Sequence, residues 1–429
     1  MAPLNPTVTV FDVDLPPGVA FVRSLGRAGA PVRVCTADRG AAGCYSRYAR
    51  RVDECPPVRR TDEFVGWLAE EIASGAIDLI APTSDYVSFC VSAAVDKVGI
   101  ETGSVGHPDP DAVRTCLFKS RFHAAMARIG FPSPLTRTPT SVAEALTMAE
   151  EISYPVVLKP RSHAGIGVRR GVVVRSAADL EATFRPFPLA WGQDAVLAED
   201  PDLALPLLQH YHELGTIDVV SVSGYLGRDG AIQALTHSRK VSQSPRRLGV
   251  GTMFEPLAPG RPYTGPAVEA VTTVLGTGVF EFEILVDRAT GEYGALDLNP
   301  RGFGQISLDI ALGRDLPVLW YNDVTGARLP TARPSRRTPR FWHDALGSYV
   351  GFAVRFVRGP RRGAIAEHAW GRVAAPSVGA MHEWRDPVPG IRFGLGHLRH
   401  PRAFVRPFLV DTEVVHADAS GDPGPATAS

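Results

Sequence analysis

Lysine is scarce in this chain: only four of its 45 basic residues are lysines, and the rest are arginines. Together with 42 glycines and 37 prolines, this bias is typical of GC-rich codon usage. Arginine ends in a bulky planar fork and lysine in a compact point charge. A lysine retained in this background therefore indicates a place where the fork does not fit; the four are Lys97, Lys119, Lys159 and Lys240.

A net charge is also missing. The 45 basic residues are balanced by 45 acidic ones, which excludes a general electrostatic attraction to nucleic acid or to a membrane surface. Either partner would need a local patch, and we predict neither. The chain also lacks a signal-peptide pattern and any apolar run of the roughly 20 residues that span a bilayer. We therefore expect a cytoplasmic protein.

Cysteines are few, odd in number and without a C-x-x-C pair. This pattern excludes a disulfide framework and a thiolate zinc site. We expect free and mostly buried thiols at Cys35, Cys44, Cys55, Cys90 and Cys116. Cys44 and Cys55 fall in an expected loop, so a redox role stays open for these two.

The first 110 residues alternate short β-branched runs with helical patterns, which is typical of βαβ units and a parallel sheet. The expected elements are a strand at 8–13, a helix at 18–28, a strand at 32–35, a helix at 62–74 and a strand at 78–81. No G-x-G-x-x-G follows the first strand, which argues against a Rossmann dinucleotide site. Gly18 opens the first helix; it either forms a turn or offers backbone amides to a substrate anion.

The middle of the chain predicts a small α+β unit. A helical pattern over 111–129 carries Lys119, and the prolines that follow end it, so a domain boundary belongs near residue 112. Ser141 and Glu144 form the capping box of the next helix. The expected order after it is a strand at 155–159, a glycine loop, a strand at 171–175, a helix at 177–184, a strand at 195–199 and two strands between 217 and 236.

The segment YPVVLKPRSHAGIGVRRGVVV brings a lysine beside a glycine loop. A strand ends at Lys159, and Ser162–Gly167 supply two glycines and small residues before the chain returns as another strand. Backbone amides in such a loop approach phosphate oxygens while the lysine adds a point charge. The alternative is a flexible hairpin tip beside a solvated lysine.

A β-hairpin is expected where GVFEFEILVD and YGALDLN flank the turn DRATGE. Its strands cover 279–286 and 293–299, and Gly291 takes the positive φ that the turn requires. The chain continues as LDLNPRGFGQ, which puts Arg301 two residues past Asn299. We expect this arginine to reach the same pocket and to neutralise charge on a phosphoryl group or an acyl oxygen.

Acidic residues line this hairpin. Alternation puts Glu281 and Glu283 on one face, and Asp297 and Asn299 on one face of the partner strand. If the faces coincide, three carboxylates and an amide oxygen converge, and their mutual repulsion calls for a cation. Hard oxygen ligands without His or Cys favour Mg²⁺. The alternative is a solvated acidic hairpin that ends in an Asn-Pro turn.

The stretch HSRKVSQSPRRLGVGT is basic and rich in serine and glycine. A loop of this kind covers bound phosphates, or captures a substrate carboxylate through the bidentate fork of arginine. We favour a functional role for Arg239 and Lys240. For Arg246 and Arg247 a solvated charge run is an equal alternative.

These features, in this order along residues 8–325, resemble the ATP-grasp superfamily, especially its carboxylate-amine ligases; LDLNPRGFGQ is the most specific part. The resemblance implies an α/β plus α+β architecture, the ATP-grasp fold with a small lid subdomain and a C-terminal subdomain. The expected parts are an N-terminal Rossmann-like (pre-ATP-grasp) domain at 1–112, an ATP-grasp domain at 113–328 with its lid at about 150–210, a C-terminal extension at 329–414 that packs on the core, and a disordered tail at 415–429.

The family's site residues map onto this chain one by one. The implied phosphate-binding residues are Lys119 and Lys159 with Ser162, His163, Gly165 and Gly167 of the glycine loop; the magnesium ligands are Glu283, Asp297 and Asn299; the catalytic cations are Arg301, Lys240 and Arg239. The implied adenine hinge is Gln209, His210 and Tyr211, with Asp218 as the ribose candidate. His210 stands where the family usually has glutamate, but hinge contacts are largely made by the backbone.

The implied activity is that of an ATP-dependent ligase. A substrate carboxylate attacks the γ-phosphate of ATP, with Mg²⁺ or Mn²⁺ bridging the phosphates, and an amine then displaces phosphate from the acyl phosphate to form an amide or peptide bond. The implied partners are a small carboxylate and an amine, an amino acid or peptide among them, and the family commonly forms dimers.

Two alternatives to this activity stay open. One is another nucleophile, giving carboxylation or thioester formation. The other is a nucleotide-binding protein that has lost ligase activity. The segment HEWRDPVPG, with Trp384, Arg385 and Asp386, either shapes the substrate pocket or simply packs.

Overall fold

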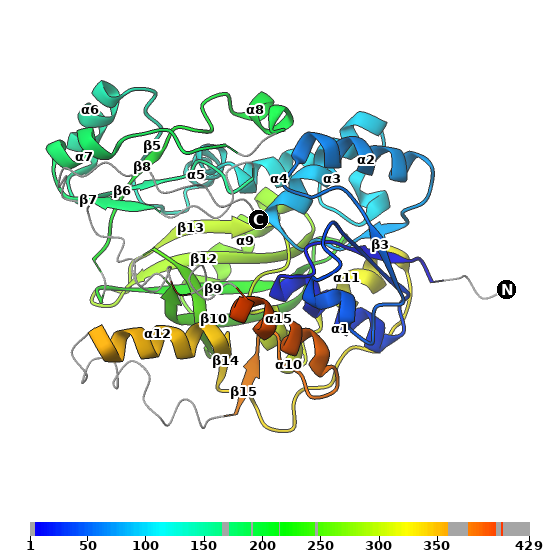
Figure 1. Cartoon of the computed structure of the whole chain (residues 1–429). Helices are drawn as coiled ribbons and strands as arrows, with labels where there is room; N and C mark the ends of the chain where they lie inside the picture. The colour runs from blue at the N-terminus through cyan, green and yellow to red at the C-terminus, as the bar shows by residue number, and fades with distance from the viewer. Residues whose placement is uncertain are drawn as a thin grey trace.

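The computed structural model describes residues 5–164, 171–189, 192–213, 215–244, 248–358, 376–399 and 405. Three sheets organise this part of the chain (Figure 1). Within the same ranges, no helix has both the length and the apolar character needed to cross a lipid bilayer. The predicted tail at 415–429 lies outside the described residues.

The N-terminal sheet is parallel, as predicted, with the order β3-β2-β1-β4. Its strands are β1 (Val8–Val10), β2 (Val32–Thr36), β3 (Arg51–Glu54) and β4 (Leu79–Ile80), and its helices are α1 (Pro16–Ala28), α2 (Thr61–Ala73) and α3 (Asp85–Val98). The first and fourth strands are shorter than expected, and β3 was not predicted. Short 3₁₀ turns follow β2 and α3, at η1 (Ala42–Tyr45) and η2 (Thr102–Val105).

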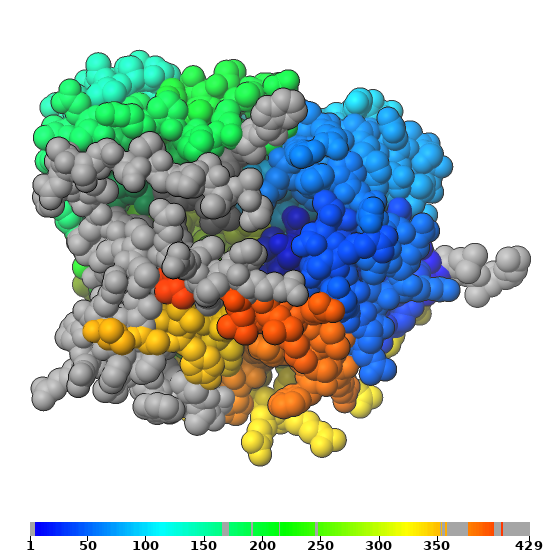
Figure 2. Space-filling model, in the orientation of Figure 1, coloured from blue at the N-terminus to red at the C-terminus, as the bar shows by residue number. Residues whose placement is uncertain are grey.

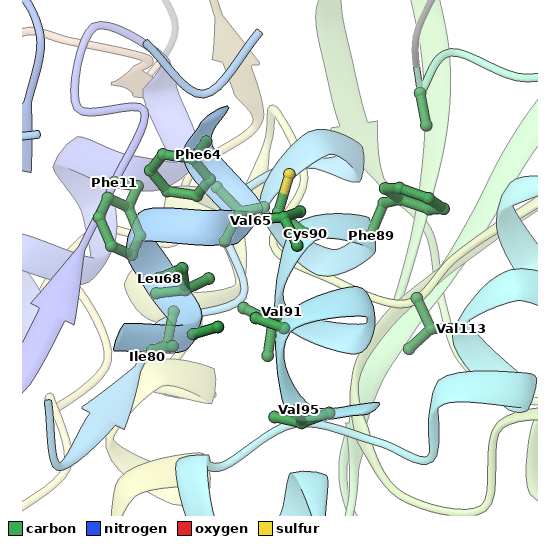
Figure 3. Packing of buried hydrophobic residues seen from close by; sticks show 14 of the residues in the cluster. Phe11, Phe64, Val65, Leu68, Ile80, Phe89, Cys90, Val91, Val95 and Val113 are labelled. Carbon is green, nitrogen blue, oxygen red and sulfur yellow. The ribbon is translucent and has the colours of Figure 1, made fainter. Parts of the chain in front are cut away.

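Aromatic and aliphatic side chains from β1, α2 and α3 form the core of this domain (Figure 3). Phe11, directly after β1, meets Phe64 of α2 edge to face, with ring centroids 5.1 Å apart. Cys90 of α3 belongs to the same cluster, and all five cysteines are free. Burial raises the pKa of Cys44 to about 11 and that of Cys55 to about 12, so both remain protonated thiols at neutral pH. This disfavours the redox role left open for them.

The predicted helix at 111–129 is two helices, α4 (Pro110–Leu117) and α5 (Lys119–Arg128). Phe118 breaks the pattern because its backbone is extended and its side chain is buried. The break leaves Lys119 at the start of α5, where its backbone N–H donates to the Arg161 carbonyl at 2.9 Å. The break therefore fixes the position of Lys119 at the start of α5.

The segment predicted as the lid belongs to a four-stranded antiparallel sheet with the order β5-β8-β6-β7, which begins before residue 150. Its elements are β5 (Thr136–Arg137), α6 (Val142–Ile152), β6 (Val156–Lys159), β7 (Val172–Val174), α7 (Ala177–Thr183), α8 (Asp194–Glu199) and β8 (Leu207–His210). Ser141 caps α6 as predicted, but Glu144 reaches back to Thr140 instead of completing the box on Ser141.

The predicted strand at 195–199 is wrong, because these residues form the helix α8. The Asp62 carboxylate of α2 accepts the backbone N–H groups of Asp194 at 3.0 Å and Ala195 at 2.9 Å. A carboxylate at this position satisfies donors that a first helical turn leaves unpaired. The cap comes from a residue more than 130 positions earlier, so local sequence does not contain it.

The central sheet has seven strands in the order β13-β12-β9-β10-β11-β14-β15. Its strands are β9 (Ile217–Leu226), β10 (Ile232–Ser244), β11 (Val250–Pro256), β12 (Gly278–Asp287), β13 (Tyr293–Asn299), β14 (Phe341–His343) and β15 (Ser377–Gly379). Helices α9 (Thr264–Leu275), α10 (Ile306–Ala311) and α11 (Leu316–Thr325) pack on it. The predicted hairpin is confirmed, with Gly291 at φ 75° in its turn.

The C-terminal helices are α12 (Ala345–Arg358) and α15 (Pro387–Arg399). Asp386, just before α15, is buried and accepts Arg23 Nε at 2.9 Å, Ser46 Oγ at 2.7 Å and the Arg47 backbone N–H at 3.0 Å. Its carboxylate therefore docks α15 on the N-terminal domain.

Replacing Asp386 by alanine is expected to lower the free energy of unfolding by about 3–5 kcal/mol, because Arg23 is left buried with only the Glu383 carboxylate, 3.9 Å away, and Ser46 and Arg47 lose their acceptor. Urea unfolding followed by circular dichroism measures this. Glu383→Ala is the matched control: its pair with Arg27 is half-exposed and contributes about 1 kcal/mol or less. Equal losses in the two variants would contradict the buried role of Asp386.

Candidate active site

The register of the β12–β13 hairpin brings the predicted acidic residues together. Glu283 pairs with Asp297, and Glu281 pairs with Asn299. Residues paired across an antiparallel ladder carry their side chains on the same face. The two faces therefore coincide, as strand alternation predicted.

Two lysines neutralise the hairpin carboxylates. Lys119 Nζ donates to Asp297 Oδ2 at 2.9 Å, and Lys240 Nζ, from β10, donates to Glu283 Oε1 at 2.6 Å. Burial by itself raises the pKa of Asp297, but the Lys119 ammonium outweighs it and holds that pKa below its ordinary value. Burial likewise opposes the charge on Lys240, yet the Glu283 carboxylate raises the pKa of this lysine. Asp297 is therefore a carboxylate and Lys240 an ammonium at neutral pH.

Glu281 lies on the same face but is not paired with a lysine. Its carboxylate accepts Ser221 Oγ at 2.8 Å, Asn299 Nδ2 at 3.1 Å and the side-chain amide of Gln305. Burial, and then the Glu283 carboxylate, raise the pKa of Glu281 to about 7. The three carboxylates therefore share one face, as alternation predicted, and Glu281 orients the Asn299 amide.

The remaining oxygen donors fit a hard cation. Glu283, Asp297 and Asn299 lie on one face, and each lysine bonds a single oxygen of its carboxylate. Across the described part of the chain, no three His, Cys, Asp or Glu side chains gather into a metal-binding group. Two carboxylates and an amide still suit Mg²⁺, because this ion commonly takes its other ligands from water and substrate phosphates.

Lys159 approaches the hairpin from the lid, where it ends β6. Its Nζ donates to Gln209 Oε1 at 2.7 Å, and Gln209 Nε2 lies 2.9 Å from Thr136 Oγ1 and 3.1 Å from His123 Nε2. Burial, followed by the Lys119 and Lys159 ammoniums, lowers the pKa of His123 to about 4, so the ring is neutral and accepts this bond. Gln209, predicted at the adenine hinge, therefore uses its side chain to position Lys159.

The pKa of Lys159 falls to about 8 through burial and then through repulsion from Lys119. Between pH 7 and pH 9 this lysine loses its charge, so we expect the dissociation constant for ATP to rise about tenfold. In Lys159→Arg the cation persists, so the profile should be flat over this range, but with weaker binding because the fork does not fit the Gln209 contact. Calorimetric titration at several pH values tests this; parallel profiles for the two proteins would refute it.

The predicted hinge residues are bonded within the lid. The His210 backbone N–H donates to the Leu135 carbonyl at 3.0 Å, and that of Tyr211 donates to the Pro155 carbonyl at 3.2 Å. Both backbone N–H groups already donate hydrogen bonds within the protein. A backbone hydrogen bond from either residue to adenine would therefore use its carbonyl oxygen. Their role in adenine binding stays a prediction.

Part of the predicted glycine loop is described. Ser162 is buried, and its Oγ accepts the Ala164 backbone N–H at 3.1 Å. His163 interacts electrostatically with Asp85 and with Asp297, which puts it beside the hairpin. The other predicted loop residues, Gly165, Gly167, Arg246 and Arg247, lie outside the described residues.

Arg239 and Asp218 are not brought to the site. Arg239 Nη1 lies 3.3 Å from Asp218 Oδ2, and Arg239 also pairs with Glu255. Arg239 and Lys240 are consecutive on one strand, so their side chains point to opposite faces. Of the two, only Lys240 reaches the acidic hairpin; the catalytic role of Arg239 and the ribose contact of Asp218 stay predictions.

Arg301 joins the hairpin to the N-terminal domain. Its Nη2 donates to Asn299 Oδ1 at 2.9 Å, and its Nε donates to Asp85 Oδ1 at 2.8 Å, at the start of α3. Burial raises the pKa of Asp85, but Arg301 outweighs it and keeps the carboxylate ionised. The next residue, Gly302, donates its N–H to the Pro82 carbonyl at 2.7 Å. The arginine is therefore held from both sides.

Sequence reasoning missed the loops after β1 and β4. The order β3-β2-β1-β4 makes the carboxyl ends of β1 and β4 a topological switch point, where open α/β sheets bind ligands. Asp12 follows β1 and accepts the Ser84 hydroxyl, which follows β4. Burial raises the pKa of Asp12 to about 6. A signal was present in the sequence, since the acidic tripeptides DVD (12–14) and TSD (83–85) come shortly after the two strands.

Gly18 allows α1 to pack closely against the loop after β1. A Cβ on this residue would lie 2.5 Å from the Asp12 carbonyl oxygen. Helix α1 begins at Pro16, so Gly18 lies in its first turn and does not open it as predicted. Glycine is required there by tight packing under the β1 loop, which is neither of the two roles left open for Gly18.

No family model matches the sequence. Among solved structures, the biotin carboxylase of Campylobacter jejuni superposes with a TM-score of 0.58 at 19% identity, over 76% of this chain and 72% of that one. N5-carboxyaminoimidazole ribonucleotide synthetase gives 0.59 at 15% identity, over 82% and 85%. These are ATP-grasp proteins, and their likeness covers about three quarters or more of this chain. The chain has the ATP-grasp fold.

Pyruvate carboxylase of Rhizobium etli shows the limits of this likeness. It superposes at a TM-score of 0.57 and 18% identity over 75% of this chain, which spans only 29% of its length. At such identities the ATP-grasp fold is shared, whereas activity has to be argued from the residues of this chain.

Proposed function

We propose that this ATP-grasp protein is a ligase that activates a carboxylate as an acyl phosphate and joins it to an amine, releasing ADP and phosphate. One observation carries the proposal: the β12–β13 register sets Glu283, Asp297 and Asn299 on one face, with Arg301 bonded to the last of them. A cation-binding face beside a buried, bidentate arginine is suited to phosphoryl transfer.

The cationic side chains have separate tasks in this proposal. Lys119 and Lys159 bind the ATP phosphates, and Lys240 keeps the Glu283 carboxylate in place. ATP would supply the phosphoryl group and Mg²⁺ or Mn²⁺ would neutralise its charge, held by the two carboxylates and the amide. Arg301 stabilises the negative charge that develops on the acyl oxygens as the amine adds.

The amine enters at the switch point of the N-terminal sheet. As the C–N bond forms and the bond to phosphate breaks, the amine nitrogen must lose a proton. The Asp12 carboxylate, with a pKa near 6, is ionised at neutral pH and suited to bind an ammonium group and to accept that proton. Asp85, one residue past Ser84, connects this point to Arg301.

Asp12→Asn is expected to raise the KM for the amine about tenfold or more and to leave the KM for ATP unchanged. The fall in rate below pH 6, caused by protonation of Asp12, should disappear in the variant. Steady-state ADP release at varied amine concentration and pH measures both effects. Asp14→Asn, an exposed change in the same loop, is the control; a similar loss there, or a raised KM for ATP in Asp12→Asn, would count against the assignment.

A panel of acids and amines, scored by ADP release and product mass, tests the ligase proposal directly. Hydroxylamine should intercept the acyl phosphate as a hydroxamate. ATP binding without ADP release for any acid would overturn it.

Carboxylation is the second candidate, because two of the structural neighbours are named carboxylases. Bicarbonate belongs in the panel for this reason. ADP release that requires bicarbonate, with a carboxylated product, would favour this candidate over amide formation.

A further inference from the structure

The C-terminal extension is basic although the whole chain is neutral. Residues 329–414 contain 14 arginines, no lysine and six acidic residues. Two of the acidic residues bind the N-terminal domain: Asp386 bonds Arg23 and Glu383 pairs with Arg27. Exposed arginines that make no ion pair with another described residue are Arg333, Arg336, Arg337, Arg340, Arg385 and Arg392. The extension therefore has the local positive patch that the overall composition conceals.

The same extension exposes large apolar side chains. Of the eleven large hydrophobic residues that are exposed in the described chain, seven lie here: Tyr349, Val357, Trp384, Val388, Ile391, Leu395 and Leu398. Trp384 is 98% exposed and Leu398 is 71% exposed. Isolated apolar side chains are normal on a surface, but a concentration of this kind marks an interaction site.

The apolar residues of α15 form a stripe. Val388, Ile391, Leu395 and Leu398 recur at intervals of three and four, which puts them on one helix face, and Trp384 lies one turn earlier. Arg392 is at the edge of this face, with its guanidinium 4.0 Å from the Tyr45 ring centroid. We call these residues, with Arg385, the basic-apolar face. Both α15 and α12 are at the surface in the same view (Figure 2).

Charge and shape together select one partner. A second copy of the chain would bring like charge against like charge, which disfavours a symmetric contact. Nucleic acid attracts arginines but gives no burial to a stripe of valine, isoleucine and leucine. An anionic bilayer satisfies both, because phosphate headgroups attract the arginines and the acyl boundary buries the apolar stripe and the tryptophan. We propose that the basic-apolar face binds the surface of a membrane that contains anionic lipid.

The proposed contact is parallel to the bilayer. The 13 residues of α15 extend about 20 Å; the buried Asp386–Arg23 pair holds the start of the helix, and Phe393 packs against the cluster that contains Val19 and Ala42. In the proposed contact, the apolar stripe of α15 inserts into the headgroup region of the bilayer. This proposal changes the expectation drawn from net charge, and it does not depend on the ligase activity.

Co-sedimentation of the full chain with vesicles tests the proposal. One set is pure phosphatidylcholine, and the other includes about 30 mol % phosphatidylglycerol. We expect at least tenfold stronger binding to the anionic vesicles, lost at about 0.5 M salt. We also expect a blue shift of tryptophan emission that is absent in Trp384→Ala. No binding, or equal binding to both sets, would overturn the proposal.

Variants distinguish membrane binding by the basic-apolar face from nonspecific hydrophobic binding. Leu395→Glu combined with Leu398→Glu should weaken binding to anionic vesicles about tenfold or more, whereas Ile100→Glu, an exposed apolar change in the N-terminal domain, should not. Unchanged thermal unfolding shows that the double variant is folded; if it is not, Trp384→Ala serves alone, since its side chain supports no core. A dimer in sedimentation velocity that the double variant abolishes, or tighter binding to duplex DNA than to vesicles, would overturn the proposal in favour of that partner.

Discussion

Asp297→Asn is expected to lower turnover about 10³-fold or more. The carboxylate faces Glu283 across the hairpin and neutralises Lys119, so its loss removes a cation ligand and leaves the lysine buried without its counter-charge. ADP release at saturating substrates gives the rate. A thermal-shift titration with ATP and Mg²⁺ shows whether the stabilisation by the metal complex is also lost.

The control for this change is Glu292→Gln, which removes an exposed carboxylate from the turn end of the same hairpin. It should leave turnover within about twofold, since exposed charges outside a site contribute little. Near-normal turnover in Asp297→Asn would exclude Asp297 from the cation site. It would also contradict the hypothesis that this face of the hairpin is catalytic.

Arg301→Lys is expected to lower kcat about 10²–10³-fold while the KM for ATP changes about threefold or less. Lysine keeps the charge but cannot bond Asn299 and Asp85 at the same time, because only the planar guanidinium presents donors in two fixed directions. The split between kcat and KM distinguishes a group that acts on the transition state from one that binds the nucleotide.

Arg288→Lys is the matched control for this arginine. Arg288 makes a two-pronged contact with Asp218, but its side chain is half exposed. Arg288 is in the turn of the β12–β13 hairpin and not among its acidic residues, so its replacement should have little effect on kcat. A kcat for Arg301→Lys within about threefold of the parent would show that the fork is dispensable.

The pairing of the two acidic strands is the part of the site that sequence predicted best. Side-chain alternation along each strand and a glycine turn fix the register of a hairpin locally. This register places Glu283 opposite Asp297. The same reasoning put Glu281 opposite Asn299, but it did not predict the bonds of Glu281 to Ser221 and Gln305, which come from a strand and a loop distant in sequence. Alternation assigns a face, but it does not say which neighbour a side chain will bond.

For the lysines, too, the sequence identified the candidates but the structure was needed to assign their contacts. Their scarcity singled out Lys119, Lys159 and Lys240, and the structure places these three around the hairpin. The fourth, Lys97, is exposed in the last turn of α3, where a cation suits the helix dipole. Composition could identify the candidates because arginine was the default cation, but it could not rank them.

The sequence by itself determined the ATP-grasp order of elements, the acidic hairpin and the lysines beside it, because these depend on periodicity and short-range turns. The tertiary structure decided what the distant loops do. It joined Arg301 to Asp85, set Asp12 against Ser84, capped α8 with Asp62 and gathered arginines and apolar residues on α15. Each of these contacts joins residues through the packing of separate elements, and no local pattern records that packing.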